Sequence, residues 1–264
     1  MEYIGYFASI LIGIVLGLIG GGGSILIIPI LVYLFKVNPQ SATSYSLFVV
    51  GISALVGSFR HFKLGNLKIK SALVFALPSL ISLLLIRKVI LPILPTEILR
   101  INDFVLTKNI LIMIFFAILM IAASVFMIKK TEDISGEIVV VNYNKLAFIG
   151  FLVGFITGFL GAGGGFLIIP ALLFFAKLPI KQAVGTSLLI IFINSSIGFI
   201  GDLYGNINLD YKLLFTVAGL AIVGMLIGTA LSKKIDGVKL KPAFGYFVLI
   251  MGIYIVAKEF FLNS

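Results

Sequence analysis

The chain has 264 residues, of which 61% are hydrophobic and 11% charged, and its mean hydropathy is +1.23. Soluble domains carry about 25% charged residues, so the composition excludes that class. The net charge of +10 does not indicate nucleic-acid binding. Its basic residues flank apolar segments and form no basic face with interleaved aromatics. The absence of cysteine excludes disulfides, thiol chemistry and cysteine-bound metals.

Apolar runs of roughly 17–25 residues, the length that spans a bilayer, recur along the chain. The expected helices of the first half are Ile4–Ile19, Ser24–Phe35, Ser41–Phe59, Ile69–Ile86 and Asn109–Ile128. Those of the second half are Lys145–Leu160, Phe166–Ala176, Gln182–Gly201, Tyr211–Leu231 and Pro242–Phe261. We expect the first run to be a retained helix rather than a signal peptide, because no basic region precedes it.

Two polar stretches divide these runs. Residues 91–107 are expected to form a long connection in the first half, and residues 131–144 are the most polar stretch of the chain. The latter is the natural boundary between a first membrane repeat, residues 1–130, and a second, residues 145–264.

The two halves repeat one unit. Gly17–Lys36 recurs as Gly158–Lys177 at an offset of 141 residues, and the alignment runs without a gap to Ser58 and Phe199. Of these 42 aligned pairs, 15 are identical, including four glycines, a proline and a lysine. Chance matching of apolar residues does not place these in register, so the sequence indicates a tandem duplication.

The second run of each half has only about twelve residues, or about 18 Å as a helix, against a hydrocarbon core of about 30 Å. It either dips in and returns, or is half of a broken crossing. If every run crosses, 13 of the 20 Lys and Arg residues lie on one side; if the short runs return, the split is 11 to 9. The positive-inside rule favours the first, with ten crossings and both termini outside. The expected fold is therefore an all-α polytopic membrane protein of two inverted repeats, each with about five apolar segments.

The glycine runs that precede the short segments point to a binding site. Backbone that leaves a helix within hydrocarbon must be buried in protein or line a wet cavity. The short segments begin directly after the glycines, so their unpaired N–H groups and helix dipoles favour an anion there. Two such ends, related by an inverted repeat, are expected to converge on one site. The alternative is that these glycines only allow close helix packing.

Hydroxyl and amide side chains lie in equivalent places after both glycine runs. They can bind an oxyanion without a buried charge, or they can simply hydrogen-bond between helices. The expected substrate-binding residues are Gly20, Gly21, Gly22, Gly23, Ser24, Ser44, Ser46, Gly161, Gly163, Gly164, Gly165, Thr186, Ser187 and Asn194. Pro29 and Pro170 lie too far into the short segments to be first-turn prolines, and they serve either as structural bends or as gating hinges.

Charged candidates are few. The apolar segments contain no clear mid-membrane charge; Arg87 ends segment four, while Arg60 and Asp202 are expected at the membrane interface. His61, the only histidine, is expected to be solvated. No catalytic constellation, Walker motif, metal site or cofactor motif is present, so we expect neither an enzyme nor a self-contained ATP-driven pump. The residues identify neither a coupling ion, whether proton or sodium, nor an oligomeric state.

At these residues the chain resembles the sulfite exporter TauE/SafE family, also called the TSUP family of membrane permeases. The resemblance covers essentially the whole chain and includes the segments QSATS and KQAVGTS. The family pattern GxxGxGGGxxxxP reads Gly17, Gly20, Gly22, Gly23, Ser24 and Pro29 in the first half, and Gly158, Gly161, Gly163, Gly164, Gly165 and Pro170 in the second. Ser24 replaces the last glycine of the first copy, which puts the equality of the two half-sites in doubt.

The resemblance implies a multi-pass permease of a bacterial or archaeal inner membrane, surrounded by lipid. Its substrate would be a sulfur oxyanion or organosulfonate such as sulfite, sulfoacetate or thiosulfate. Family members are usually described with about eight helices rather than ten. An anionic substrate fits the argument from helix N-termini, whereas sulfur follows from no residue here. Two alternatives are an anion channel and a non-transporting accessory subunit of a membrane complex.

Overall fold

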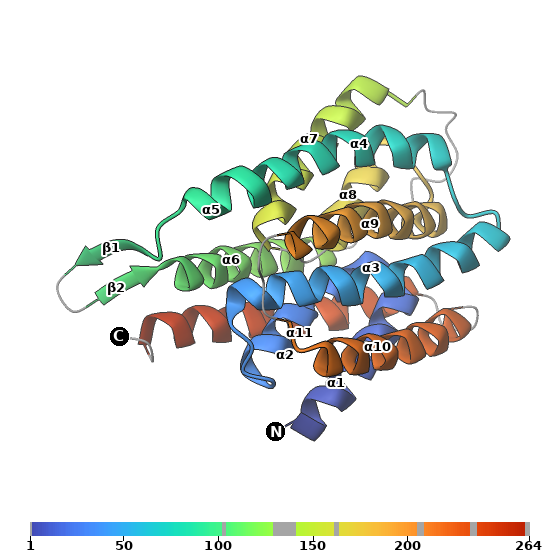
Figure 1. Cartoon of the computed structure of the whole chain (residues 1–264). Coiled ribbons are helices and arrows are strands. Elements are labelled where there is room, and N and C mark those ends of the chain that lie inside the picture. Colours follow the sequence, from blue (N-terminus) through green and yellow to red (C-terminus); the bar gives the residue numbers. More distant parts are fainter. Residues whose placement is uncertain are drawn as a thin grey trace.

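The computed structural model describes residues 2–101, 104–128, 141–160, 164–204, 209–232 and 237–261. Within these residues the chain is almost entirely helical, with one short β-hairpin (Figure 1). In chain order the elements are α1 (Glu2–Ile19), the 3-10 helix η1 (Gly21–Leu26), α2 (Ile27–Tyr33), α3 (Pro39–Lys63), α4 (Ile69–Leu85), the π-helical turn η2 (Ile86–Ile90), α5 (Leu91–Ile93), β1 (Glu97–Ile101), β2 (Phe104–Thr107), α6 (Lys108–Ile128), α7 (Tyr143–Leu160), α8 (Gly165–Phe175), α9 (Ile180–Leu203), α10 (Tyr211–Leu231) and α11 (Gly237–Phe261).

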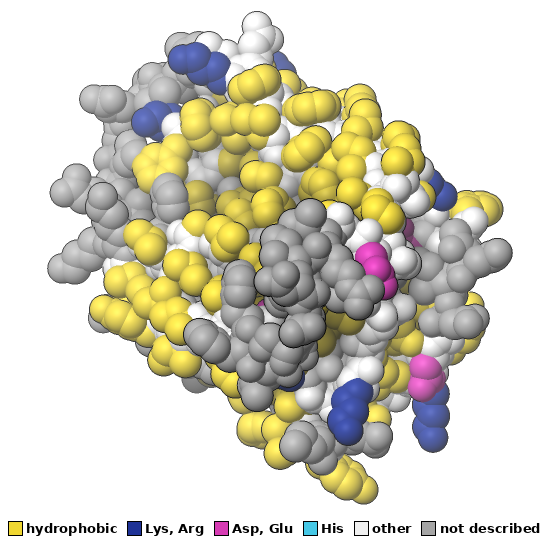
Figure 2. Space-filling model, turned by 90° about the vertical axis from the view of Figure 1, so that its left-hand side faces the viewer, with side chains coloured by type: hydrophobic (Ala, Val, Ile, Leu, Met, Phe, Trp, Pro, Cys, Tyr) yellow, Lys and Arg dark blue, Asp and Glu magenta, His cyan; other side chains and the backbone are white. Residues whose placement is uncertain are grey.

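The surface and the helix lengths are those of a membrane protein. Among the described residues, six helices are long and apolar enough to cross a bilayer: Pro39–Lys63, Ile69–Ile93, Lys108–Val125, Tyr143–Leu160, Ile180–Leu203 and Tyr211–Leu231. Phe148, Leu77 and Ile250 are more than half exposed, as lipid-facing side chains are. Figure 2 shows one end of the molecule, where hydrophobic side chains cover much of the described surface and Lys and Arg lie near its outline. The predicted all-α polytopic fold is confirmed.

The two halves interlock. The first helix of each half packs on the fourth helix of the other, since α1 lies against α10 and α7 lies against α4 (Figure 1). A β-carbon on Gly13 would lie 2.9 Å from the Cα of Gly224, and one on Gly17 would lie 2.9 Å from the carbonyl carbon of Gly228. These small residues let the backbones approach closely, as small-xxx-small pairs do in membranes. Gly13 and Gly17 thus allow close packing of α1 on α10.

The corresponding helices α3 and α9 form the centre of the bundle and run antiparallel. Their register follows from three contacts along the seam, namely Ser44 with Asp202, Gly51 with Ser195, and His61 with Gly185. Residue numbers increase along α3 as those of the contacting residues decrease along α9, so the two helices are antiparallel. The two outer contacts are counterparts, because Ser44 corresponds to Gly185, and His61 to Asp202, at the offset of 141 residues.

The ends of the short helices also repeat. Lys36 and Lys177 both have a left-handed backbone, with φ of 56° and 51°. In each case the N–H of the next residue donates a hydrogen bond to the carbonyl six residues earlier. Val37 donates to Leu31 at 2.9 Å, and Leu178 donates to Leu172 at 3.3 Å. A left-handed residue just past a helix end satisfies the last carbonyl groups in this way. The same local geometry thus recurs at the offset seen in the sequence.

Two expectations about the first half were wrong. The fourth helix does not end at Ile86 but continues through η2 and α5 to Ile93. Apolar residues flank Arg87 and Lys88 on both sides, and Pro92 falls in the first turn of α5, where its missing N–H is tolerated. Residues 97–107, expected as a connection, include the antiparallel hairpin β1–β2, which extends beyond the neighbouring helices (Figure 1).

Most of the expected connection 131–144 lies outside the described residues. The division into a repeat at residues 1–130 and a repeat at residues 145–264 stays a prediction.

Candidate functional site

The two glycine runs meet at the start of their short helices. α1 ends at Ile19, and the next residue, Gly20, has φ of 80° and ψ of −146°. Gly21, the first residue of η1, touches Gly165, the first residue of α8, so closely that a β-carbon on Gly165 would lie 2.6 Å from the carbonyl carbon of Gly21. Glycine is needed here because no side chain fits between the two backbones. Helix starts from the two halves therefore converge.

Helix α9 covers this contact. A β-carbon on Gly20 would lie 2.8 Å from the Cγ1 of Val184, and one on Gly21 would lie 2.5 Å from the Cδ1 of Ile191. Ser187 lies between these positions at helical spacing, on the same face of α9. Its hydroxyl donates to the Val184 carbonyl at 2.8 Å. The buried Ser24 hydroxyl likewise donates to the Gly21 carbonyl at 2.7 Å.

Of the five other expected glycines, the structure describes three. Gly22 and Gly23 lie within η1, so the first run forms a 3-10 helix rather than an irregular loop. Gly164 precedes α8 in the left-handed conformation, with φ of 71°. Gly161 and Gly163 lie outside the described residues.

The two prolines occupy different positions. Pro170 is the sixth residue of α8, inside the helix as expected. Pro29 is the third residue of α2 and thus lies in its first turn, which the sequence analysis had ruled out. The reason is that the glycines and Ser24 form η1 first, which delays the start of the α-helix. A hinge role for either proline stays a prediction.

Four buried side-chain oxygens of the described residues lie on α3 and α9 without a partner. Ser46, Ser53 and Ser195 are fully buried and Asn194 is 1% exposed. Within the described residues, the three hydroxyl oxygens and the Oδ1 of Asn194 have no hydrogen-bond partner. The Nδ2 of Asn194 donates to the Ser79 hydroxyl on α4 at 2.7 Å. Buried polar groups without partners are rare and each needs an explanation.

Thr186, by contrast, is satisfied. Its buried hydroxyl accepts from the Lys68 backbone N–H at 3.1 Å. This bond ties α9 to the segment before α4, so the hydroxyl already has a structural partner.

The sequence analysis missed a buried ion pair between the halves. Arg87 on η2 is 8% exposed and pairs with Asp202 on α9. The Nε of Arg87 donates to one carboxylate oxygen at 2.8 Å, and its Nη2 donates to the other. Ser44 donates to the same carboxylate at 2.6 Å. Arg87 and Asp202 are therefore paired within the protein, with their side chains 5% and 10% exposed.

The opposite end of the α3–α9 seam has a different chemistry. The Nη1 of Arg60 donates to the Thr229 hydroxyl at 2.7 Å and to the Leu226 carbonyl at 3.2 Å, which ties α3 to α10. His61 is 8% exposed rather than solvated, because Gly185 on α9 packs against it. The two ends of the seam thus occupy equivalent places in the two halves, but one carries an ion pair and the other an arginine bonded to neutral groups.

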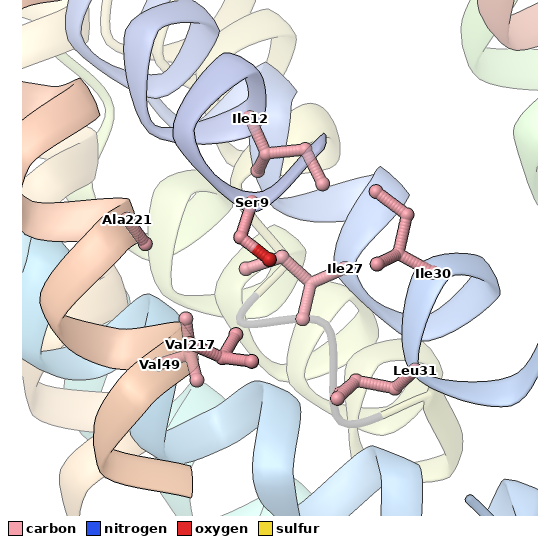
Figure 3. A pocket seen from close by; sticks show the side chains of 8 residues that line it. All are labelled: Ser9, Ile12, Ile27, Ile30, Leu31, Val49, Val217 and Ala221. Atoms are coloured by element: carbon pink, nitrogen blue, oxygen red, sulfur yellow. The ribbon is translucent and has the colours of Figure 1, made fainter. Parts of the chain in front are cut away.

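A separate apolar crevice lies between α1, α2, α3 and α10 (Figure 3). It is too narrow to hold a water molecule, and its lining is Ser9, Ile12, Ile27, Ile30, Leu31, Val49, Val217 and Ala221. Ser9 supplies its polar group, but this hydroxyl already donates to the Gly5 carbonyl at 2.8 Å. The crevice therefore offers an anion no unsatisfied donor.

The structure is that of a multi-pass α-helical membrane protein. It has apolar helices of membrane length, short helices that start at glycine runs, and buried polar side chains on its central helices. The chain belongs to the sulfite exporter TauE/SafE family, whose sequence model matches residues 6–255. It is therefore a membrane transporter and not an enzyme.

Relatives agree with this assignment over nearly their whole length. A "Probable membrane transporter protein" of Xylella fastidiosa is 30% identical over 260 residues, which cover 94% of this chain and 92% of the relative. The similarly named YunE of Bacillus subtilis is 28% identical, covering 96% of each chain. MJ0441 of Methanocaldococcus jannaschii is 26% identical, covering 94% of each. None of the solved structures compared with the chain matches it.

Proposed function

We propose that this transporter carries a small anion, of the sulfur oxyanion or organosulfonate class, between the glycine contact and the α3–α9 seam. Sulfite is an expected substrate, as the family description suggests, and sulfoacetate and thiosulfate are expected as anions of the same class. The observation that carries the proposal is the set of unpartnered buried oxygens at Ser46, Ser53, Asn194 and Ser195. Leaving each buried group unpaired costs about 1–3 kcal/mol, a cost that is explained if this part of the bundle opens to polar solutes.

The glycine contact supports an alternating mechanism. Gly21 and Gly165 touch, so this conformation leaves no room for a solute between them. Transport then requires the runs to separate, which would uncover the first N–H groups of η1 and α8 to an anion. Gly20, Gly164 and the hydroxyl of Ser187 border the same point, and Pro29 and Pro170 are the proposed hinges.

The antiparallel seam supports the inverted arrangement of the repeats. Equivalent helices that pack antiparallel are related by a two-fold axis across them, and such an axis lies in the membrane plane for spanning helices. This arrangement follows if each half has an odd number of crossings. We therefore infer ten crossings, with each short helix serving as half of a broken crossing.

Uptake of sulfite into proteoliposomes tests the proposal. Saturable uptake by the wild-type protein is expected, with loss of uptake in Gly21→Leu, because the larger side chain has no room against Gly165 and disrupts the contact at which the runs separate. Gly219→Leu is the matched control, since a β-carbon on Gly219 meets nothing within 4 Å and the residue is exposed on α10. Equal uptake by both variants would remove the glycine run from the mechanism.

Two further measurements separate the alternatives. Trans-stimulation of sulfite flux is expected of a transporter and not of a channel. Stabilisation of the purified protein by millimolar sulfite or thiosulfate is expected of a transporter and not of an accessory subunit. Non-saturating flux without trans-stimulation would favour the channel.

A further inference from the structure

Arg87 is a charge held within an apolar helix. It lies in the span Ile69–Ile93, and its side chain is 5% exposed. Charges inside membrane helices are costly and by default mark function. A buried ion pair is often no more stabilising than apolar residues of the same volume. Stability alone therefore does not account for Arg87 and Asp202, and the π-helical turn that carries Arg87 is of a kind often found at functional sites.

The shape of the ion pair indicates what Arg87 can bind. Both carboxylate oxygens of Asp202 accept from the guanidinium, one from Nε and one from Nη2. This two-pronged geometry is the one by which arginine recognises oxyanions with two oxygens on one central atom. We propose that Arg87 binds the transported oxyanion through this fork, and that the Asp202 carboxylate occupies the fork when no anion is bound. The inference rests on the proposed function and deepens it.

The surroundings of Arg87 suit such an exchange. Ser44 accepts from the Nη2 of Arg87 at 3.1 Å and donates to Asp202 at 2.6 Å. When the carboxylate leaves, this hydroxyl is free to donate to the incoming anion. Thr43 accepts from the same Nη2 at 3.2 Å, and its hydroxyl donates to the Gln40 carbonyl at 2.7 Å. Ser44 thus supplies the donor, and Thr43 holds the fork in place.

Arg87 also contacts the last turn of α7, the helix that precedes the second glycine run. Its Nη1 donates at 3.3 Å to the carbonyl of Gly158, two residues before the end of α7. A cation near a helix C-terminus is stabilised by the helix dipole. This bond joins the end of the α3–α9 seam to the segment that leads into the glycines. An anion on Arg87 therefore sits at the entrance to the proposed path.

Arg60 provides a matched control. It lies at the opposite end of the seam, and its acceptors in the described residues are the neutral Thr229 hydroxyl and Leu226 carbonyl. Replacing Arg60 removes one positive charge from the same helix bundle without touching the fork.

The test compares sulfite uptake by wild-type protein, Arg87→Gln/Asp202→Asn, Asp202→Asn and Arg60→Gln in proteoliposomes. The double variant leaves no lone buried charge, so it is expected to fold, and its kcat/KM for sulfite should fall by about tenfold or more, the scale of one lost charge-assisted hydrogen bond. Arg60→Gln should keep wild-type uptake. In Asp202→Asn the competing carboxylate is gone, so sulfite should raise Tm more than in the wild type. Chloride, which offers no pair of oxygens, should give no such difference.

Each outcome bears on one of the two proposals. Saturable wild-type uptake that the double variant retains would overturn the role of Arg87 and leave the proposed function standing. An equal sulfite-dependent Tm shift in Asp202→Asn and wild type would also overturn it. Absence of saturable sulfite and thiosulfate uptake by the wild-type protein would instead overturn the proposed function, and this inference with it.

Discussion

Gly21 and Gly165 face each other across the two halves of the chain with no space for a side chain on either. A β-carbon on Gly21 would lie 2.9 Å from the carbonyl carbon of Gly165, and one on Gly165 would lie 2.6 Å from that of Gly21. Each glycine opens a short helix. The repeated glycine run of the sequence thus corresponds to one point of contact in the fold.

Alanine at either position should therefore act on both stability and transport. Gly165→Ala forces the two backbones apart and should lower the free energy of unfolding by about 1–3 kcal/mol, the cost of overpacking. The shifted contact should also lower sulfite uptake. Thermal unfolding of the purified protein and uptake into proteoliposomes measure the two effects.

Gly219→Ala is the control for this change. Gly219 is an exposed residue within α10, and nothing lies within 4 Å of the added carbon. Alanine is the better helix former by about 1 kcal/mol, so this variant should be no less stable than the wild type. A Gly165→Ala protein as stable as Gly219→Ala would mean that the backbone contact has been overestimated.

The unpartnered buried hydroxyls of α3 and α9 allow a structural role to be separated from a functional one. Ser53 is fully buried and its hydroxyl has no partner in the described residues. Ser53→Ala should raise the free energy of unfolding by about 1 kcal/mol, because it removes an unsatisfied buried group. The same change should lower sulfite uptake if this hydroxyl lines the path. Stability and activity are thus expected to move in opposite directions.

Ser124→Ala on α6 is the matched control. Ser124 is also fully buried, but its hydroxyl donates to the Ile121 carbonyl at 2.6 Å. Its removal should leave uptake unchanged and should not stabilise the protein. If Ser53→Ala and Ser124→Ala proved indistinguishable in both assays, Ser53 would belong to ordinary helix packing.

Local signals predict the helices well and the ion pair poorly. Hydrophobic run length alone gives Tyr211–Leu231 at its observed ends, because an apolar run between polar residues has few alternatives in a membrane. Arg87 followed by Lys88 instead resembles the usual basic end of a crossing. The apolar residues that continue to Ile93 are the signal that could have placed Arg87 inside the helix.

The partner of Arg87 was beyond a reading of local sequence. Asp202 lies 115 residues away, in the other half of the chain. The pairing depends on how α4 packs against α9, and no pattern within either helix encodes that contact. The glycine runs were easier to interpret because their duplication is visible in the sequence. Their mutual contact required only that the two copies meet.

The left-handed lysines at the ends of the short helices make a stability prediction. Lys36 has φ of 56°, a conformation that costs a side-chain-bearing residue about 1–2 kcal/mol. Lys36→Gly should relieve this strain and raise Tm, although glycine's greater freedom in the unfolded chain reduces the gain. Lys36→Ala removes the same charge but keeps the strain, so it should not raise Tm. If both substitutions changed Tm equally, the change would be due to the lost charge and not to backbone strain.

The same two lysines test whether the repeats are inverted. Lys36 and Lys177 are exposed, have the same backbone geometry and occupy equivalent places in the two halves. With ten crossings they lie on opposite sides of the membrane, whereas with returning short segments they share one side. The chain contains no cysteine, so Lys36→Cys and Lys177→Cys each carry a single thiol. A membrane-impermeant maleimide added to intact cells should label Lys36→Cys at once and Lys177→Cys only after the cells are opened. Labelling of both from the outside, or of neither, would contradict the inverted arrangement, because the antiparallel packing of α3 and α9 requires the two ends to face opposite compartments.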